Sequence, residues 1–219
     1  MTIYIVNPNS TQEVTDGIDR TVDPMRRFSP VPIEARTLAE GPPGIETQAH
    51  VDGVVAPLLA HCAALEDSAS AFVIACYSDP GLAALREQSA RPVLGIAEAS
   101  ILTAMTLGQR FGIISILSKS IPRHMRYVGA MGVMDRLAAD MPLELGVLEL
   151  ADEERTFDRL KTVGSRLRDE AMANVLILGC AGMTRYCDDL QEYLGVPVVE
   201  PCRAAAAMAI GRVALEQTN

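Results

Sequence analysis

The chain has 219 residues, of which 49% are hydrophobic and 21% are charged, and its formal net charge is −9. This length and composition suit one compact domain or two small lobes, and they exclude a disordered chain and a small scaffold held together by disulfides. Lys and Arg are scattered without forming a basic stripe, and aromatic residues make up only 4%, which argues against nucleic acid as a partner.

The first half of the chain alternates short apolar runs with helical patterns. Ile3–Val6 is rich in β-forming residues, and the segment around it lacks the basic region and cleavage site of a signal peptide, so we interpret it as a first strand. Further strands are predicted over Val31–Arg36, Ala71–Ala75 and Pro92–Ile96, and helices after Thr11, over His50–Asp67 and after Gly81, with Pro80 near the first turn of the last. The continuous apolar run at Ala71–Ala75 is typical of a parallel strand that is buried on both faces.

The second half repeats this plan. Strands are predicted over Phe111–Ile116, Leu143–Leu150, Val175–Gly179 and Val196–Val199, and helices over Asp152–Ala173 and Arg203–Glu216. Cys180 follows Cys76 by 104 residues and Pro197 follows Pro92 by 105, and the members of each pair hold the same place relative to a strand. We therefore predict an α/β fold of two similar lobes related by a pseudo-twofold axis, each a short, mostly parallel sheet flanked by helices. Residues 1–97 are predicted to form the first lobe, joined by the C-terminal helix 203–219, and residues 98–202 the second.

The cysteine count and spacing indicate the compartment and the cofactors. Five cysteines without a secretory signal favour reduced thiols. No run of about 18 apolar residues occurs, so we expect a cytoplasmic protein without membrane contact. Neither a Cys-x-x-Cys pair nor a glycine-rich phosphate loop is present, so no metal site and no cofactor are predicted.

Cys76 and Cys180 are the candidates for catalysis. Each follows a predicted buried strand, and ligands of parallel α/β sheets bind beyond the carboxyl ends of the strands. If the two lobes face each other, the thiols approach one cleft from opposite sides, and a helix N-terminus after each cysteine is expected to lower the thiol pKa from about 8.5 towards neutrality. A thiolate and a thiol on either side of one carbon can remove a proton from one face and return one to the other, as a two-base racemase acting next to a carbonyl requires.

Other interpretations of these residues have less support. A single cysteine at the end of an apolar strand is more often a core residue, and we assign that role to Cys62, Cys187 and Cys202. A Cys–His acyl-transfer enzyme needs a base beside its nucleophile, whereas the three histidines have no motif context, and His124 is placed at the surface or behind the site. A small-molecule binding module with a two-lobed cleft is the alternative outside enzymes, although it has no need of two opposed thiols.

Five segments carry a resemblance to a known family. They are IVNPNS at Ile5–Ser10, ACYSDPGL at Ala75–Leu82, PVLGIAEAS at Pro92–Ser100, RFGIIS at Arg110–Ser115 and LGCAGM at Leu178–Met183. On these motifs the whole chain resembles the aspartate/glutamate/hydantoin racemase superfamily, and most closely its hydantoin and allantoin racemase branch. The resemblance implies cofactor-independent 1,1-proton transfer with Cys76 and Cys180 as opposed acid and base, an active site between two similar lobes, and a homo-oligomer.

Two features of the cysteine motifs bear on the substrate. Aspartate and glutamate racemases usually place hydroxyl or imidazole side chains after their cysteines, whereas Ala181 and Gly182 offer only backbone N–H groups. Such groups can hydrogen-bond a ring carbonyl and its developing enolate, which favours a cyclic ureide such as a 5-substituted hydantoin or allantoin. Tyr77 and Ser78 stand where the branch commonly has Phe-Gly, so the pair leaves the exact substrate open. A maleate-type cis–trans isomerase, which also keeps both thiols, and an aspartate/glutamate-type racemase stay as alternatives.

We therefore predict a hydantoin-type racemase of a small-molecule substrate, in which Cys76 and Cys180 alternate as base and acid. The residues predicted to position the ring are Asn9, Ser10, Tyr77, Ser78, Ser115, and Ala181 and Gly182 through their N–H groups. Asn9 and Ser10 also suit a turn or a helix cap.

Overall fold

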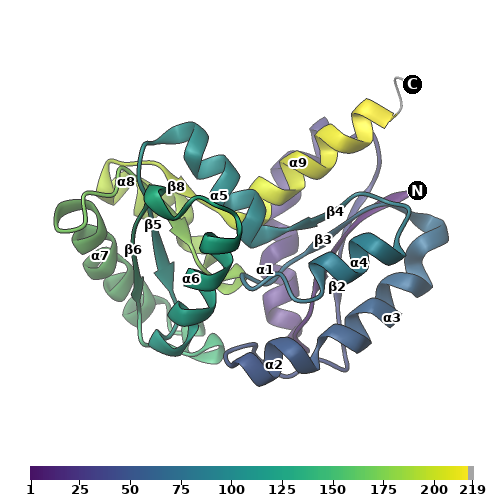
Figure 1. Ribbon diagram of the computed structural model, residues 1–219, viewed down its shortest axis with the longest axis horizontal. Coiled ribbons are helices and arrows are strands. Elements are labelled where there is room, and N and C mark those ends of the chain that lie inside the picture. The colour runs from purple at the N-terminus through teal and green to yellow at the C-terminus, as the bar shows by residue number, and fades with distance from the viewer. Residues whose placement is uncertain (217–219) are drawn as a thin grey trace.

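The computed structural model describes residues 1–216, which form an α/β protein built around two four-stranded sheets (Figure 1). The strands are β1 (Thr2–Asn7), β2 (Ile33–Thr37), β3 (Ala69–Ile74), β4 (Val93–Gly95), β5 (Phe111–Ser115), β6 (Leu137–Pro142), β7 (Val175–Leu178) and β8 (Val198–Val199). The α-helices are α1 (Gln12–Val22), α2 (Gln48–Gly53), α3 (Val55–Leu65), α4 (Leu82–Gln88), α5 (Ile96–Leu107), α6 (Ile121–Ala130), α7 (Glu153–Asp169), α8 (Cys187–Leu194) and α9 (Pro201–Glu216). None of the helices in this part of the chain is both long enough and apolar enough to cross a membrane.

The two sheets have the same topology. Their strand orders are β2-β1-β3-β4 and β6-β5-β7-β8, and the neighbouring strands pair in parallel. β3 and β7 therefore hold equivalent places, and Cys76 and Cys180 lie just beyond their carboxyl ends. In Figure 1 the first sheet lies on the right with α2, α3 and α4, and the second lies on the left with α6, α7 and α8. The predicted α/β fold of two similar lobes is confirmed.

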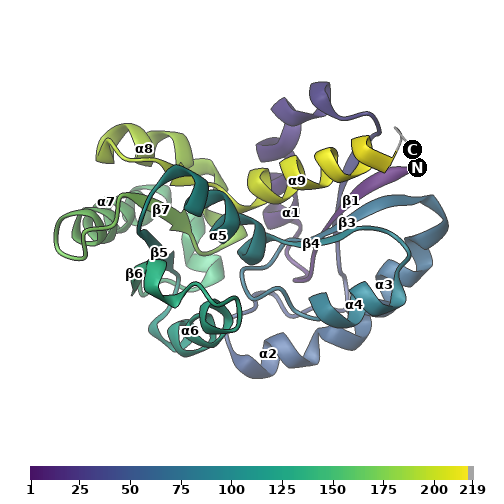
Figure 2. The same ribbon diagram turned by 45° about the horizontal axis from the view of Figure 1, so that its top comes forward.

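Apolar side chains fill the space between the two sheets as well as their outer faces. One cluster of buried residues joins Ile5 and Val73 of the first sheet to Ile113 and Ile177 of the second. α5 and α9 contribute to this cluster, and Figure 2 shows both helices at the junction of the lobes. Further clusters lie beneath α3 and α4 in the first lobe and beneath α7 and α8 in the second. Because each fully buried Ile or Val contributes about 1.5–3 kcal/mol, the shared layer holds the lobes in a fixed relation.

The division of the chain at residue 97 stays a prediction. α5 begins at Ile96 and runs across this position, and the apolar layer to which it belongs serves both sheets. α9 packs against β3, β4 and α5, on the side of the first sheet, where the sequence analysis places the C-terminal helix. Residues 217–219 of that predicted helix lie outside the described residues.

The strand predicted at Leu143–Leu150 is wrong. The edge strand of the second sheet is instead β6, and it ends at Pro142, which has no N–H to donate. Glu144 then adopts a positive φ of 57°, which is incompatible with a regular strand. The apolar residues that follow belong to a 3₁₀ helix over Val147–Ala151, which buries Leu150 in the core. The apolar run reflects burial in a loop and a short helix, which alternation alone does not distinguish from a strand.

One helix also differs from the prediction. His50–Asp67 was predicted as one helix, but α2 and α3 meet at Val54, because Pro57 has no N–H for the carbonyl four residues earlier. α4 begins at Leu82, directly after Gly81 as predicted, and Pro80 lies two residues before it. Gly81, with φ of 69°, forms a left-handed turn immediately before that helix.

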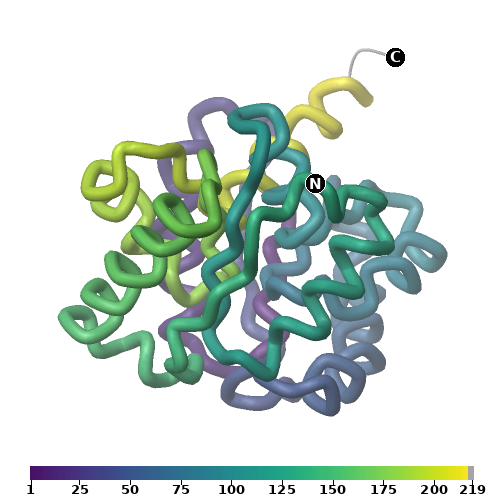
Figure 3. The backbone as a smooth tube through the Cα atoms, turned by 60° about the vertical axis from the view of Figure 1, so that its left-hand side comes forward, coloured from purple at the N-terminus to yellow at the C-terminus, as the bar shows by residue number. Residues whose placement is uncertain are grey.

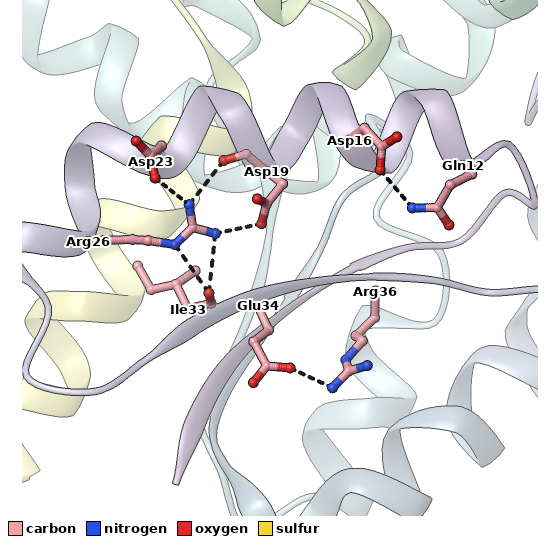
Figure 4. A network of polar contacts seen from close by, with 8 residues as sticks. All are labelled: Gln12, Asp16, Asp19, Asp23, Arg26, Ile33, Glu34 and Arg36. Atoms are coloured by element: carbon pink, nitrogen blue, oxygen red, sulfur yellow. Dashed lines mark hydrogen bonds and ion pairs between the residues drawn. The ribbon is translucent and has the colours of Figure 1, made fainter.

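Arg26 fixes the junction between α1 and β2 (Figure 4). Its guanidinium donates to the Ile33 carbonyl and forms ion pairs with Asp19 (2.5 Å) and Asp23 (2.9 Å). Such half-exposed ion pairs each contribute at most about 1 kcal/mol, but together they tie the helix to the edge strand. At the other end of α1, the β1–α1 loop carries Asn9 to the carboxyl end of the sheet.

Candidate active site

Cys76 lies in a tight loop at the carboxyl end of β3. The Ala75 N–H still pairs with β1, donating to the Val6 carbonyl (2.8 Å), and the Asp79 N–H then donates to the Cys76 carbonyl (2.9 Å) to close a turn. Asp79 and Gly81 both adopt positive φ, at 42° and 69°, and this lets the chain reverse before α4. The turn places the half-buried Cys76 side chain at the edge of the sheet.

A buried carboxylate anchors this loop. Asp79 accepts the backbone N–H groups of Ala97 (3.0 Å) and Glu98 (2.9 Å) at the N-terminus of α5, and the hydroxyl of Tyr127 (2.7 Å) on α6. A Cβ at Gly95 would overlap the Asp79 carboxyl group, so the approach requires glycine there. Burial raises the pKa of Asp79 to about 6 in spite of its three donors. One side chain thus connects the Cys76 loop to elements of both lobes.

Cys180 occupies the equivalent place beyond β7, where it caps a 3₁₀ helix over Ala181–Tyr186. Its Sγ accepts the Gly182 backbone N–H at 3.3 Å. The backbone N–H of Ser78 stands in the same relation to Cys76, two residues further along, and lowers the pKa of that thiol. Each thiol therefore receives a backbone N–H from its own loop, which stabilises its thiolate form.

Both cysteines line one cavity between the lobes, whose space of about 450 Å³ is partly open to solvent. Residues from the first sheet's loops and helices are Asn9, Val14, Ile45, Ala75, Cys76, Tyr77 and Ser78, and those from the second are Ile116, Ser120, Arg123, His124, Val147, Gly179, Cys180, Ala181 and Gly182. The structure thus brings the two thiols to one site from opposite lobes.

Burial dominates the electrostatics of both thiols. It raises the pKa of Cys76 to about 12 and that of Cys180 to about 11, and the N–H groups of Ser78 and Gly182 offset only part of this effect. The predicted lowering of both thiol pKa values is therefore wrong. Cys76 does not adjoin a helix N-terminus, since α4 begins six residues further on, and Cys180 adjoins only a short 3₁₀ helix. A charge on Cys180 also raises the pKa of Cys76, whereas Arg123 lowers it.

Arg123, which the sequence analysis missed, extends from α6 into the cavity wall. Its Nε donates to the Ser78 hydroxyl (2.8 Å), and within residues 1–216 no carboxylate lies at ion-pair distance from its guanidinium. Figure 3 shows α6 of the second lobe beside the first lobe, where Arg126 of the same helix donates to Gln48 of α2 (2.8 Å). The terminal nitrogens of Arg123 are thus available to stabilise negative charge on a ligand.

His124 is the second missed residue, and it lies in the cavity wall although it was placed at the surface or behind the site. Its Nδ1 is 2.8 Å from a carboxylate oxygen of Asp140 on β6, whose side chain is fully buried. The ring also packs edge to face against Tyr77, at 5.1 Å between centroids. With Nδ1 engaged, Nε2 is the nitrogen available to the cavity. Among the described residues no three His, Cys, Asp or Glu side chains gather closely enough to hold a metal ion.

The predicted ring-binding residues divide into two groups. Asn9, Tyr77, Ser78, Ala181 and Gly182 line the cavity, whereas Ser10 and Ser115 do not. Ser115 is fully buried, and its hydroxyl contacts His124 Nδ1 (3.1 Å) and the Asp140 carboxylate. Ser10 lies in the loop outside the cavity, and its N–H donates to the Pro42 carbonyl (3.0 Å). The Gly182 N–H donates to Cys180 Sγ, so in this structure it stabilises the thiolate instead of facing a ligand.

Asn9 both shapes the loop before α1 and lies in the cavity wall. Its side-chain oxygen accepts from the Asn7 amide (3.0 Å) and from the Thr11 N–H (3.0 Å), which shapes the loop before α1. The same residue lines the cavity. The two interpretations made from the sequence, turn residue and site residue, are therefore compatible.

Comparison with known proteins identifies the family of this chain. The family model described as Asp/Glu/Hydantoin racemase matches residues 3–209. A hydantoin racemase of Pseudomonas sp. (strain NS671) is 35% identical over 205 residues, which cover 91% of this chain and 81% of that protein. Two solved structures are also similar: an allantoin racemase from Klebsiella pneumoniae (TM-score 0.92, 28% identity, 99% of this chain and 89% of that one) and one from Pseudomonas fluorescens (TM-score 0.91, 26% identity, 99% and 92%). The chain belongs to the Asp/Glu/hydantoin racemase family and is an isomerase of the racemase class.

Proposed function

We propose that this racemase inverts C5 of a 5-substituted hydantoin or an allantoin-like cyclic ureide, without a cofactor, by proton transfer between two cysteines. The observation that carries the proposal is that Cys76 and Cys180 line one cavity, each following the equivalent strand of its own sheet. The similarity to proteins named hydantoin racemase and allantoin racemase supports this substrate class.

The reaction begins with one cysteine as thiolate and the other as thiol. The thiolate removes the proton from C5, so that an S–H bond forms as the C–H bond breaks and the electron pair moves into the enolate of the C4 carbonyl. The opposite thiol then gives its proton to the other face of C5 as the carbonyl reforms. The two sulfurs have exchanged protonation states, and the enzyme returns to its starting state by proton exchange with solvent or by acting on the other enantiomer.

The cavity supplies the charge stabilisation that this sequence of steps needs. Negative charge develops on the C4 oxygen, and Arg123 offers N–H donors with no carboxylate competing for them among residues 1–216. Donors already aimed at such a charge are worth about 10²–10³-fold in rate. Asn9 and Ser78 add polar contacts for the ring. The raised thiol pKa values mean that each cysteine, once ionised, is a stronger base towards the C–H bond.

The test is solvent deuterium incorporation across a substrate panel. Single enantiomers of 5-alkylhydantoins and of allantoin, with aspartate, glutamate and maleate, are incubated in D₂O and followed by NMR and polarimetry, and protein-free rates are subtracted. Exchange and racemisation of a hydantoin or of allantoin supports the proposal. Turnover confined to aspartate or glutamate indicates an amino-acid racemase, conversion of maleate indicates a cis–trans isomerase, and no exchange with any of these compounds would overturn the proposed substrate class.

The cofactor independence in the proposal has its own test. Activity is expected to survive exhaustive EDTA treatment, because thiol-based proton transfer needs no metal. A loss of activity that zinc restores would overturn this part. The predicted homo-oligomer and cytoplasmic location stay predictions, which light scattering and cell fractionation test.

A further inference from the structure

A second hollow adjoins the catalytic cavity on the Cys180 side. Its space of about 650 Å³ is partly open to solvent, and Val14, Val147, Ala181 and Gly182 line both the hollow and the cavity. Two of these shared residues directly follow Cys180. A group attached to a carbon held between the thiols therefore has somewhere to extend besides solvent.

The walls of this hollow, which we call the substituent pocket, are mostly apolar. They include Val14, Gly17, Val147, Leu148, Leu150 and Ala151. Its polar residues are largely occupied elsewhere: the Thr11 hydroxyl donates to the Pro43 carbonyl (2.7 Å), and the exposed Arg185 pairs with Glu153 (2.6 Å).

The pocket has two further polar residues. Thr184 contributes one hydroxyl, and Glu13 is exposed at the rim. A ureido group carries three N–H donors and a carbonyl, and these two side chains do not match them. Burying such a group without partners is unfavourable, whereas burying an alkyl or aryl group is favourable.

We infer that the substituent pocket receives an apolar 5-substituent, a branched alkyl or arylmethyl group, in preference to the ureido substituent of allantoin. The inference rests on the proposed function and selects among the substrates that function allows. The ring occupies the polar cavity beside Arg123 and Ser78, and the substituent passes between Val14 and Gly182 into the pocket.

Gly17 provides a direct way to measure this pocket. It lies within α1, and the nearest atom to a Cβ built there is Thr184 Oγ1 at 4.0 Å, so a larger side chain grows into the pocket. Replacing glycine inside a helix also favours the helical backbone. Gly211 is the matched control, since it lies within α9, lines neither hollow, and has nothing within 4 Å of a Cβ.

The experiment measures kcat/KM for racemisation of 5-methyl-, 5-isobutyl- and 5-benzylhydantoin and of allantoin, with protein-free rates subtracted. We expect the wild type to favour the isobutyl and benzyl compounds over allantoin by at least about tenfold. Gly17→Leu is expected to lower kcat/KM for these two compounds at least about tenfold and to leave 5-methylhydantoin within about twofold. Gly211→Leu should match the wild type.

A second variant keeps the test decisive if Gly17→Leu does not fold. Ala151 is exposed on the 3₁₀ helix and lines the pocket, so Ala151→Phe fills the pocket from a different element and is expected to give the same selectivity change. A wild type that prefers allantoin, or pocket variants that slow 5-methyl- and 5-benzylhydantoin equally, would overturn the inference and leave the proposed function intact. Failure to exchange C5 of any hydantoin or of allantoin overturns the proposed function and the inference with it.

Discussion

The two cysteine loops are alike around the sulfur atoms. Cys76 follows β3 and Cys180 follows β7, at equivalent places in sheets with the same strand order. Each thiolate is stabilised by the backbone N–H two residues further on, and burial raises the pKa of each thiol. A reaction that can start from either face of one carbon needs two groups of similar acidity, and the repeated loop geometry supplies them.

The loops differ in what supports them. Asp79, within the Cys76 loop, caps α5 and accepts from Tyr127 of the other lobe. In the second lobe the carboxylate that caps the corresponding helix is Glu200, which accepts the N–H groups of Cys202 (3.0 Å) and Arg203 (2.6 Å) and stands outside the Cys180 loop. The Cys76 loop is therefore tied to the other lobe by a buried carboxylate, whereas the 3₁₀ helix that follows Cys180 packs against α1 of the first lobe.

The largest expected effect comes from removing either thiol. Cys76→Ser and Cys180→Ser each replace an ionisable thiol by a hydroxyl that stays protonated, so racemisation should fall by about 10²–10⁴-fold or more. Each variant keeps one base and should still exchange the C5 proton of one enantiomer with solvent, and the two variants should prefer opposite enantiomers. NMR of each pure enantiomer with each variant in D₂O measures this.

Cys62→Ser is the control for that experiment, because Cys62 is fully buried beneath the first sheet and lines no part of the cavity. It should retain racemisation of both enantiomers. The assignment of opposed thiols would be refuted if Cys76→Ser and Cys180→Ser exchanged the C5 proton of the same enantiomer. It would also be refuted if either variant racemised the substrate at the wild-type rate.

Arg123 should have the next largest effect. Arg123→Met removes the cation from the cavity and is expected to lower kcat/KM on the order of 10²-fold. Since Arg123 lowers the pKa of Cys76, its loss leaves less thiolate at a given pH, and the rising limb of the pH–rate profile should move to higher pH. Arg123→Lys should recover part of both effects.

Arg126→Met is the matched control on the same helix, since Arg126 contacts Gln48 instead of the cavity. Its kcat/KM should stay within about twofold of the wild type. An unshifted pH profile in Arg123→Met would show that Arg123 does not lower the pKa of Cys76, and would contradict this part of its role.

The unequal support of the two loops predicts a smaller effect. Asp79→Ala and Glu200→Ala each leave helix N-terminal N–H groups without a cap, and each should lower the free energy of unfolding by about 1–3 kcal/mol. Alanine at the positive φ of position 79 adds some strain. Only Asp79→Ala should also lower kcat, by about tenfold, because Cys76 then loses its anchored position. Denaturant unfolding and kcat at 25 °C test both variants, and equal losses of kcat would contradict lobe-specific support.

The sequence was sufficient to predict the features that repeat. Buried parallel strands produce continuous apolar runs, so Ala71–Ala75 and Val175–Gly179 reveal β3 and β7, and the cysteine after each run marks the cavity. Leu143–Leu150 has a similar apolar content but is buried in a loop and a 3₁₀ helix, which a local pattern does not distinguish from a strand.

Arg123, His124 and Asp140 were missed for a different reason. Arg123 and His124 reach the site because α6 lies beside the first lobe, and Asp140 of β6 contacts His124 there. This arrangement depends on contacts between residues distant in sequence, such as Tyr127 with Asp79. The thiol pKa values were also misjudged, because burial outweighs the single N–H that each loop donates. The Arg-His pair after the strand at Phe111–Ile116 was the one available signal, since the carboxyl end of β5 also reaches the cavity.

The two capping carboxylates should also titrate differently. Burial raises the pKa of Glu200 from 4.5 to about 7, and that of Asp79 from 3.8 to about 6, where Tyr127 supplies a third donor to the ionised form. In each case the folded chain holds the proton more tightly than the unfolded chain. The free energy of unfolding that each bound proton contributes is therefore fully present below the pKa that the carboxyl group has in the unfolded chain. It is lost as the pH rises through the pKa that the group has in the folded chain.

Glu200→Gln should accordingly remove one part of the pH dependence of stability. In the wild type, ionisation of Glu200 lowers the free energy of unfolding between about pH 4.5 and pH 7, by on the order of 1–3 kcal/mol. In the variant, the free energy of unfolding should no longer fall above about pH 6. Below about pH 6 it should still fall as the pH rises, because Asp79 ionises there. Because Glu200 lines neither the cavity nor the substituent pocket, kcat at a fixed pH should stay within about twofold. Denaturant unfolding at half-unit steps from pH 4 to pH 8 measures the difference, and parallel curves for the two proteins would show that Glu200 does not titrate in this range.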